Sequence, residues 1–226
     1  LHYMTYGNEE GNYLRTMTEA VYDLLKAYQW YKARGKDRPE WAAVVNKYAE
    51  FLLDRQNEDG SWYRTYTKEG SPVFMNEDRD STEEEKNRGR KASSAIPVPF
   101  LCALAEEYPE DRRYEKAAVR AAEYTLSHEC RKELYQGGTM DNPNIVDKEA
   151  AQYVMAGLYS LYSLTGKKKY LEGAGTAAKQ FVTWNYIWNA PVKEGTVLAE
   201  KKFRTKGIGA INSIWCGGVV DIYSLF

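Results

Sequence analysis

The feature that most constrains the fold is an alternation of predicted helices with connections of two lengths. Apolar side chains recur every three or four residues from 12 to 33, for example at Leu14, Met17 and Val21, which predicts a helix with one buried face. The same reasoning predicts helices over 39–55, 94–107, 113–129, 148–164, 168–185 and from 209 to the end. Short polar turns follow the first, third and fifth helices. Long loops over 58–92, 130–146 and 184–207 follow the second, fourth and sixth.

The repeating unit is therefore a helix, a short turn, a second helix and a long loop. The second helix of each unit begins with an aromatic residue, Trp41, Tyr114 or Tyr170, and continues with small residues. A single helical hairpin cannot bury both of its faces, so successive units must pack side by side. We therefore predict an all-α fold, an (α/α) toroid built of helical hairpins, with all long loops at one end. Function is expected at that end.

The number of helices predicts an incomplete ring within a single domain, 1–226. The last predicted helix contains Ile211, Ile214 and Trp215 and has no following partner. We expect an incomplete (α/α)6 barrel of about three and a half hairpins, with the remaining hairpins in a longer parent chain. The alternative is an open arc whose terminal helix packs against its neighbours.

Composition excludes several classes of function. Lys and Arg total 31 against 32 Asp and Glu, so the charge balance favours neither a nucleic acid nor an acidic membrane as a partner. No apolar stretch approaches the roughly 20 residues of a membrane span. Three scattered Cys and two His (His2 and His128) predict neither a disulfide scaffold nor a metal site, and no cofactor is implied. Cytoplasmic and exported locations both stay open.

The stretch 137–149 (GGTMDNPNIVDKE) is the most informative candidate for catalysis. Asp141 and Asn142 lie between a glycine pair and Pro143, where no structural role explains a carboxylate. Asp141 is therefore a candidate general acid or base. Asp147 is placed to cap the helix over 148–164, with Glu149 in its first turn, and a catalytic role for Asp147 is compatible with that cap.

The stretch 56–63 (QNEDGSWY) closes the second predicted helix. Gly60 permits a sharp reversal, and Trp62 is then expected to fold back onto the bundle as an aromatic plug. The functional alternative places Asp59 and Trp62, with Tyr63, at the mouth of a sugar site. In that alternative Asp59 is the second carboxylate.

Aromatic residues and one charged run are further candidates for substrate binding. The 19 Tyr and 6 Trp exceed what a core of this size needs. Flat aromatic faces next to amides suit carbohydrate, and packing in the core is the alternative. The candidates for stacking are Trp184, Tyr186, Trp188 and Trp215. The charged run over 76–91 is expected to be solvated or disordered; if it folds over the site, Arg88 is a candidate partner for a substrate carboxylate.

The segment 149–172 (EAAQYVMAGLYSLYSLTGKKKYLE) resembles the hairpin of the six-hairpin glycosidase superfamily, whose members share an (α/α)6 toroid. It is most similar to the unsaturated glucuronyl and rhamnogalacturonyl hydrolases. Their Arg-Gly-Gln-Ala-Trp motif is absent, because Glu149 stands near the position of the Arg. In those hydrolases an Asp just before the helix is the acid/base, and Asp141 lies near that place.

We therefore predict a glycoside hydrolase-like enzyme acting on an oligo- or polysaccharide, with uronic acids among the candidate sugars. A carboxylate from Asp141 or Asp147 would protonate the leaving group or activate water, opposed by Asp59. Two alternatives stay open. One is a polysaccharide lyase on the same scaffold, and the other is a non-catalytic helical module that binds carbohydrate or protein.

Overall fold

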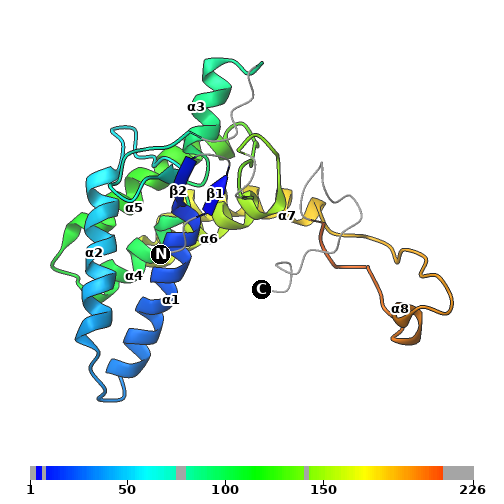
Figure 1. Ribbon diagram of the computed structural model, residues 1–226, viewed down its shortest axis with the longest axis horizontal. Helices are drawn as coiled ribbons and strands as arrows, with labels where there is room; N and C mark the ends of the chain where they lie inside the picture. The colour runs from blue at the N-terminus through cyan, green and yellow to red at the C-terminus, as the bar shows by residue number, and fades with distance from the viewer. Residues whose placement is uncertain (1–3, 7–8, 75–79, 140–142, 211–226) are drawn as a thin grey trace.

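A computed structural model describes residues 4–6, 9–74, 80–139 and 143–210. Three helical hairpins make up the body of the described structure (Figure 1). They pair α1 (Leu14–Lys32) with α2 (Pro39–Arg55), α4 (Pro97–Glu107) with α5 (Arg112–Thr125), and α6 (Lys148–Thr165) with α7 (Lys168–Thr183). This arrangement confirms the prediction of an all-α fold built of helical hairpins.

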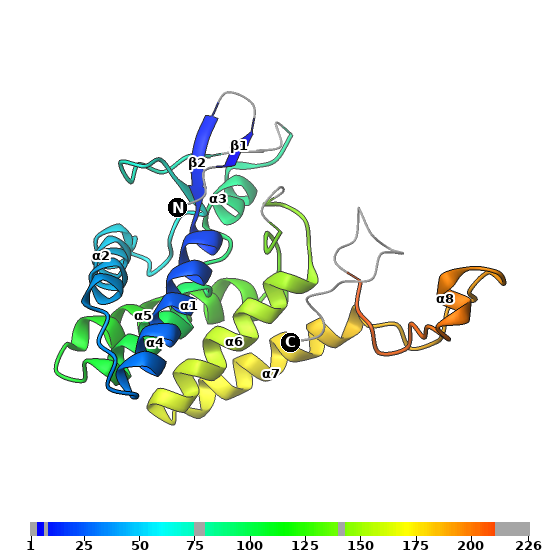
Figure 2. The same ribbon diagram turned by 60° about the horizontal axis from the view of Figure 1, so that its bottom comes forward.

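The hairpins stand side by side in chain order. Helix α4 contacts α1 on one side and α6 on the other, while α5 contacts both α2 and α6. The three short turns lie together at the lower left of Figure 2, and the N-terminal ends of α1, α4 and α6 point away from them. The connections that precede these three helices therefore meet at one end of the bundle.

Local sequence explains where the helices begin and end. Pro39 and Pro97 occupy first-turn positions, where the missing N–H costs nothing. The side chains of Asp111 and Asp147 cap α5 and α6. Helix α6 ends at Gly166, whose φ of 68° is the left-handed conformation that glycine adopts without strain.

The core lies between the two helices of each hairpin and between neighbouring hairpins. Large side chains such as Leu14, Phe100 and Leu158 belong to the same buried cluster as the alanine-rich face of α5. Ala118, Ala121 and Ala122 are fully buried, so small residues allow α5 to approach its neighbours closely.

Two differences from the predicted helices have clear causes. The first helix begins at Leu14 rather than at 12, because Asn12 and Tyr13 pair with β3 (Thr65–Tyr66) as part of β2 (Glu9–Tyr13). The strand β1 (Met4–Tyr6) pairs antiparallel with β2, giving a three-stranded sheet in the order β1-β2-β3. The fourth predicted helix continues beyond α5 as a turn of π-helix, η1 (Leu126–Cys130).

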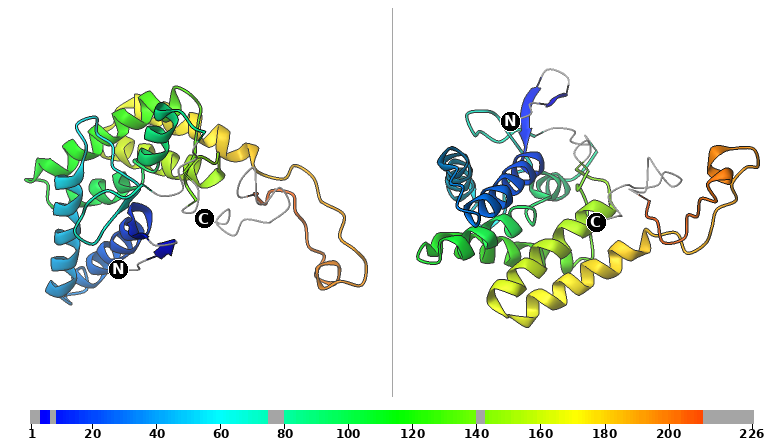
Figure 3. Two further views of the ribbon diagram at one scale, coloured as in Figure 1. Left: turned by 45° about the horizontal axis from the view of Figure 1, so that its top comes forward. Right: turned by 90° about the horizontal axis from the view of Figure 1, so that it is seen from below.

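Part of the charged run over 76–91 is helical, which differs from the expected solvated or disordered segment. Its second half forms α3 (Glu83–Lys91), which begins with a capping box between Thr82 and Glu85. Acidic residues in the first turn and basic residues in the last turn suit the helix dipole. The short helix α8 (Val197–Glu200) lies in the last long connection, which extends away from the hairpins (Figure 3). The helix predicted from 209 lies outside the described residues, apart from its first two positions.

Candidate functional site

The N-terminal ends of α1 and α6 are joined by a buried ion pair. Arg15, in the first turn of α1, donates from Nη1 to Oε2 of Glu149, in the first turn of α6. The same nitrogen donates to the carbonyl of Gly138 at 2.7 Å. The side chains are only 11% and 6% exposed, so the pair is largely removed from water. Burial opposes the charge of Arg15, but Tyr153, Glu149 and Glu19 raise its pKa, so the guanidinium stays charged.

A second arginine, Arg64, binds the same loop. Arg64 donates from Nη2 to the carbonyl of Thr139 at 2.6 Å and to that of Gly137 at 3.3 Å. Its own backbone is fixed, because its N–H bonds the carbonyl of Arg90 and its carbonyl accepts from the N–H of Leu14. The two arginines together bind the three successive carbonyls of 137–139.

Asp147 binds the N–H groups of that loop. Its Oδ2 accepts from the N–H of Gly138 at 2.8 Å and of Thr139 at 3.3 Å, while Oδ1 accepts from Ala150. Burial raises the pKa of Asp147 to about 6, against the lowering effect of these N–H donors. Both oxygens of this fully buried side chain are occupied, so Asp147 is a helix cap that also positions the loop.

The segment 137–139 is therefore held at nearly every peptide group. The N–H of Gly137 completes the set by donating to the carbonyl of Ile145 at 2.9 Å. A Cβ at Gly138 would overlap both Ala150 N and Asp147 Oδ1, so only glycine fits there. Residues 140–142, which include the predicted site residues Asp141 and Asn142, lie outside the described residues. They follow this segment directly.

A solvent-accessible carboxylate lies on the same network. Glu19, one turn along α1 from Arg15, accepts a hydrogen bond from the hydroxyl of Tyr153 on α6 and lies 3.5 Å from Nε of Arg15. The Arg15 guanidinium lies 5.0 Å from the centre of the Tyr153 ring. The side chain of Glu19 is 47% exposed. We did not predict Glu19 as a site residue, and its only sequence signal is the spacing of four from Arg15.

A second buried carboxyl, Glu129, lies on η1. Burial and the negative charge of Asp147 raise the pKa of Glu129 to about 8. Its Oε1 has no hydrogen-bond partner among the described residues. Glu129 lines a cavity of about 10 Å³ together with Arg88, Lys91 and Gln136, among others. Single π-turns within helices are frequent at functional sites, but sequence pattern alone does not reveal them.

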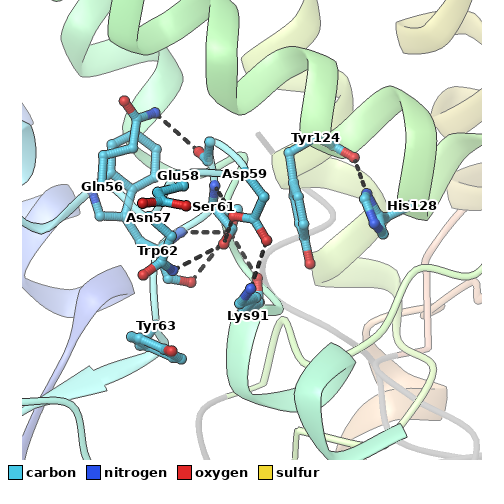
Figure 4. A network of polar contacts seen from close by, with 12 residues as sticks. Gln56, Asn57, Glu58, Asp59, Ser61, Trp62, Tyr63, Lys91, Tyr124 and His128 are labelled. Carbon is cyan, nitrogen blue, oxygen red and sulfur yellow. Dashed lines mark hydrogen bonds and ion pairs between the residues drawn. The ribbon is translucent and has the colours of Figure 1, made fainter. Parts of the chain in front are cut away.

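Asp59 belongs to a separate network (Figure 4). It accepts from Nζ of Lys91 at 2.6 Å and from Oγ of Ser61 at 2.5 Å. Burial acts to raise the pKa of Asp59, but the bonds from Lys91 and Ser61 outweigh it and the pKa is lowered. None of its described bonds reaches Asp147 or Glu149. Its predicted role as the second carboxylate stays a prediction.

The neighbours of Asp59 pack rather than line a surface. Trp62 is fully buried and donates from Nε1 to the carbonyl of Leu52 at 2.8 Å, so it is the predicted aromatic plug and offers no face to a sugar. The ring of Tyr63 lies 5.3 Å from that of Phe74 and is partly buried. Arg88 donates from Nε to Oε1 of Gln136 at 3.1 Å, which fixes α3 to the second long connection.

The predicted stacking residues that the structure describes lie at and beyond the end of α7. Trp184 is half-buried, and its carbonyl accepts from the N–H of Ala210. Tyr186 and Trp188 form an edge-to-face pair with ring centres 5.9 Å apart, and Trp188 is 58% exposed. Trp215 lies outside the described residues.

No group of three or more His, Cys, Asp and Glu that could hold a metal ion occurs in the described part of the chain. Within the same residues, no helix is both long and apolar enough to cross a membrane.

Comparison with known protein families finds no match, and comparison with curated proteins finds none either. Among solved structures, the chain is similar to Bacteroides ovatus GH9, with a TM-score of 0.48 and 16% sequence identity. The alignment covers 85% of this chain and 42% of that one, so this chain spans less than half the length of that protein. A likeness this distant does not establish an activity.

Proposed function

We propose that this chain carries the acid/base residue of a glycoside hydrolase-like enzyme acting on an oligo- or polysaccharide. The observation that carries the proposal is the support of the 137–139 segment. Two arginines and one buried aspartate bind its peptide groups, and Asp141 follows two residues later. These bonds hold the backbone of 137–139 in one position. A catalytic carboxylate on a loop requires such a fixed backbone next to it, because its distance from the substrate must be precise.

Asp141 is proposed as the general acid that protonates the leaving oxygen of a glycosidic bond. Glycoside hydrolases pair such an acid with a second carboxylate, which activates water or attacks the sugar carbon. We assign the second role to Glu19. Its carboxylate is solvent-accessible, and Arg15 connects it to both Glu149 and Gly138. Asp147 and Glu149 are positioning residues in this proposal, because both are buried and already bonded.

Tyr153 bears on the lyase alternative, in which a tyrosine would abstract a proton. Burial raises the pKa of Tyr153 well above its ordinary value, and the neighbouring Glu19 raises it further, although Arg15 acts in the opposite direction. The deprotonated fraction near neutral pH is correspondingly small. Tyr153 is therefore a poor candidate for the base of a lyase.

The test measures turnover of a panel of neutral and uronate-containing oligosaccharides by chromatography of the products. Asp141→Asn and Glu19→Gln are each expected to lower kcat/KM by a factor of about 10² to 10⁴ with little change in Tm. Glu40→Gln is the matched control, because Glu40 is exposed near the short turn of the first hairpin. Unchanged turnover in Asp141→Asn would remove this residue from catalysis.

A second candidate function, a non-catalytic carbohydrate-binding module, is favoured by the exposed ring of Trp188, which packs edge-to-face on the partly buried Tyr186. In that case Trp188→Ala weakens binding of an oligosaccharide, while no oligosaccharide of the panel is cleaved by the unaltered chain. The two candidates are thus separated by the same panel of sugars.

A further inference from the structure

A cavity of about 380 Å³ lies between α1 and α2 and extends to the residues that follow β3. Its volume is within the range of about 300–1,000 Å³ that small-molecule sites occupy. Met17 and Val21 line it from α1. Each follows Arg15 or Glu19 by two residues, which is about 200° around a helix. The cavity therefore lies on the side of α1 turned away from these two residues, and it is separate from the proposed catalytic site.

The walls of the cavity are mainly apolar and aromatic. The rings of Tyr48 and Phe51, both on α2, are nearly parallel, at 19°, with centres 5.7 Å apart. The hydroxyl of the buried Tyr48 is already hydrogen-bonded to that of Thr18 at 2.7 Å, so it is not available to a ligand. Val44, which is 50% exposed, lies at the edge. Such walls match a flat apolar molecule and offer few partners to the hydroxyl groups of a free sugar.

Two lysines give the cavity a positive charge. Lys47 and Lys68 line it, and among the described residues that line it none is acidic. Lys47 is exposed and has no acidic partner in the part of the chain that the structure describes. Lys68 lies 3.8 Å from Glu69, but these side chains are 69% and 64% exposed, and such a pair contributes little in water. A negatively charged group on the ligand therefore complements the cavity.

Asn12 adds a polar group where the cavity meets the sheet. It is 2% exposed, and its backbone pairs with Tyr66 of β3. Its side-chain Oδ1 has no hydrogen-bond partner among the described residues. An unpaired buried acceptor costs free energy, which a hydroxyl donor on a ligand would recover. We propose that this cavity binds a small aromatic carboxylic acid that carries a hydroxyl group. The ring lies between α1 and α2, the carboxylate is bound by the lysines, and the hydroxyl donates to Asn12.

The probe for this site is para-hydroxycinnamate, titrated into the full chain in a calorimeter. We expect a Kd between about 10 µM and 1 mM. Cinnamate lacks the hydroxyl and the methyl ester lacks the charge, so each should bind about 3- to 10-fold more weakly. Asn12→Ala should weaken para-hydroxycinnamate by the same factor and leave cinnamate unchanged. Lys47→Met should weaken the acid about 3- to 10-fold and leave the methyl ester unchanged, because only the acid carries the charge.

The position of the site is tested with Val44→Glu, which places a carboxylate at the edge of the cavity. Binding of para-hydroxycinnamate should weaken at least about tenfold. Asn46→Glu adds the same charge at an exposed position of α2 that does not line the cavity, and it should change the Kd by less than about twofold.

An absence of saturable binding up to about 10 mM overturns the proposal. Equal binding by Val44→Glu and the unaltered chain also overturns it, because the acid then binds elsewhere. A dimer that Val44→Glu converts to a monomer in light scattering, without saturable binding of the acid, shows instead that a second copy of the chain occupies the cavity.

Discussion

Replacing Glu129 by Gln is expected to stabilise the protein increasingly as the pH rises from 5 to 8. The pKa of Glu129 is raised from 4.5 to about 8, mainly by burial. Between these two values the native state holds a proton that the unfolded state has released, so stability falls as the pH rises. The slope is about 1.4 kcal/mol per pH unit, which amounts to about 3 kcal/mol between pH 4.5 and pH 7. A glutamine has no proton to lose, so its presence removes this part of the pH dependence.

The measurement is urea unfolding of both proteins at pH 5, 6, 7 and 8. The difference in unfolding free energy should grow by about 1.4 kcal/mol per pH unit, and at pH 7 Glu129→Gln should raise Tm by about 6–12 °C. Burial also raises the pKa of Asp147, but both proteins keep Asp147, so its contribution largely cancels in the difference. Glu110→Gln, at an exposed position in a short turn, is the control and should leave the pH profile unchanged.

A stability difference that is the same at pH 5 and pH 8 would refute this reasoning. It would mean that Glu129 has the same protonation in the native and unfolded states. The unpartnered Oε1 and the fully desolvated position would then not govern its ionisation.

Two further predictions concern the network around residues 137–139. Arg15→Met should lower the unfolding free energy by about 3–5 kcal/mol, because it leaves Glu149 buried without its ion-pair partner; adding Glu149→Gln should restore part of the loss. Urea unfolding checks both, and a double variant less stable than Arg15→Met would contradict the explanation. Gly138→Ala should cost about 1–3 kcal/mol, because its Cβ would displace the Asp147 cap. A thermal melt that matches the unaltered protein would show that the loop can relax around the added methyl.

The hairpins were predictable because their signals are local. Three- and four-residue apolar spacing, Pro39, Gly166 and the alternation of connection lengths all act within one or two helices. Helix α3 had a local signal as well, the capping box from Thr82 to Glu85, but the density of charge around it favoured a disordered interpretation. The charges in fact stabilise its two ends, because acids precede bases along the helix.

The site network was not predictable in the same way, because its contacts join distant parts of the chain. Arg15 and Glu149 are 134 residues apart, and Arg64 and Thr139 are 75 apart. No periodicity links such pairs. The sequence identified Asp147 correctly as a helix cap. Its further hydrogen bonds, from the N–H groups of Gly138 and Thr139, depend on the tertiary path of the loop that contains these two residues. Asp59 gives a second example. Its position in a loop made it a candidate for the site, but nothing in the local sequence indicated that Lys91 of α3, 32 residues away, would bind it.

The features that work against stability gather at one end of the molecule. Two of the three described non-glycine residues with positive φ, Ser93 and Glu133, lie in the long connections at this end. The third, Lys202, follows α8 in the connection that extends away from the hairpins (Figure 3). The buried carboxyls Glu129 and Asp147, whose pKa values are raised, lie at that end too. Two of the short turns, by contrast, adopt positive φ only at glycines, Gly35 and Gly166. Features that cost folding energy persist where function requires them, so this asymmetry independently favours the end at which Asp141 and Glu19 are proposed to act.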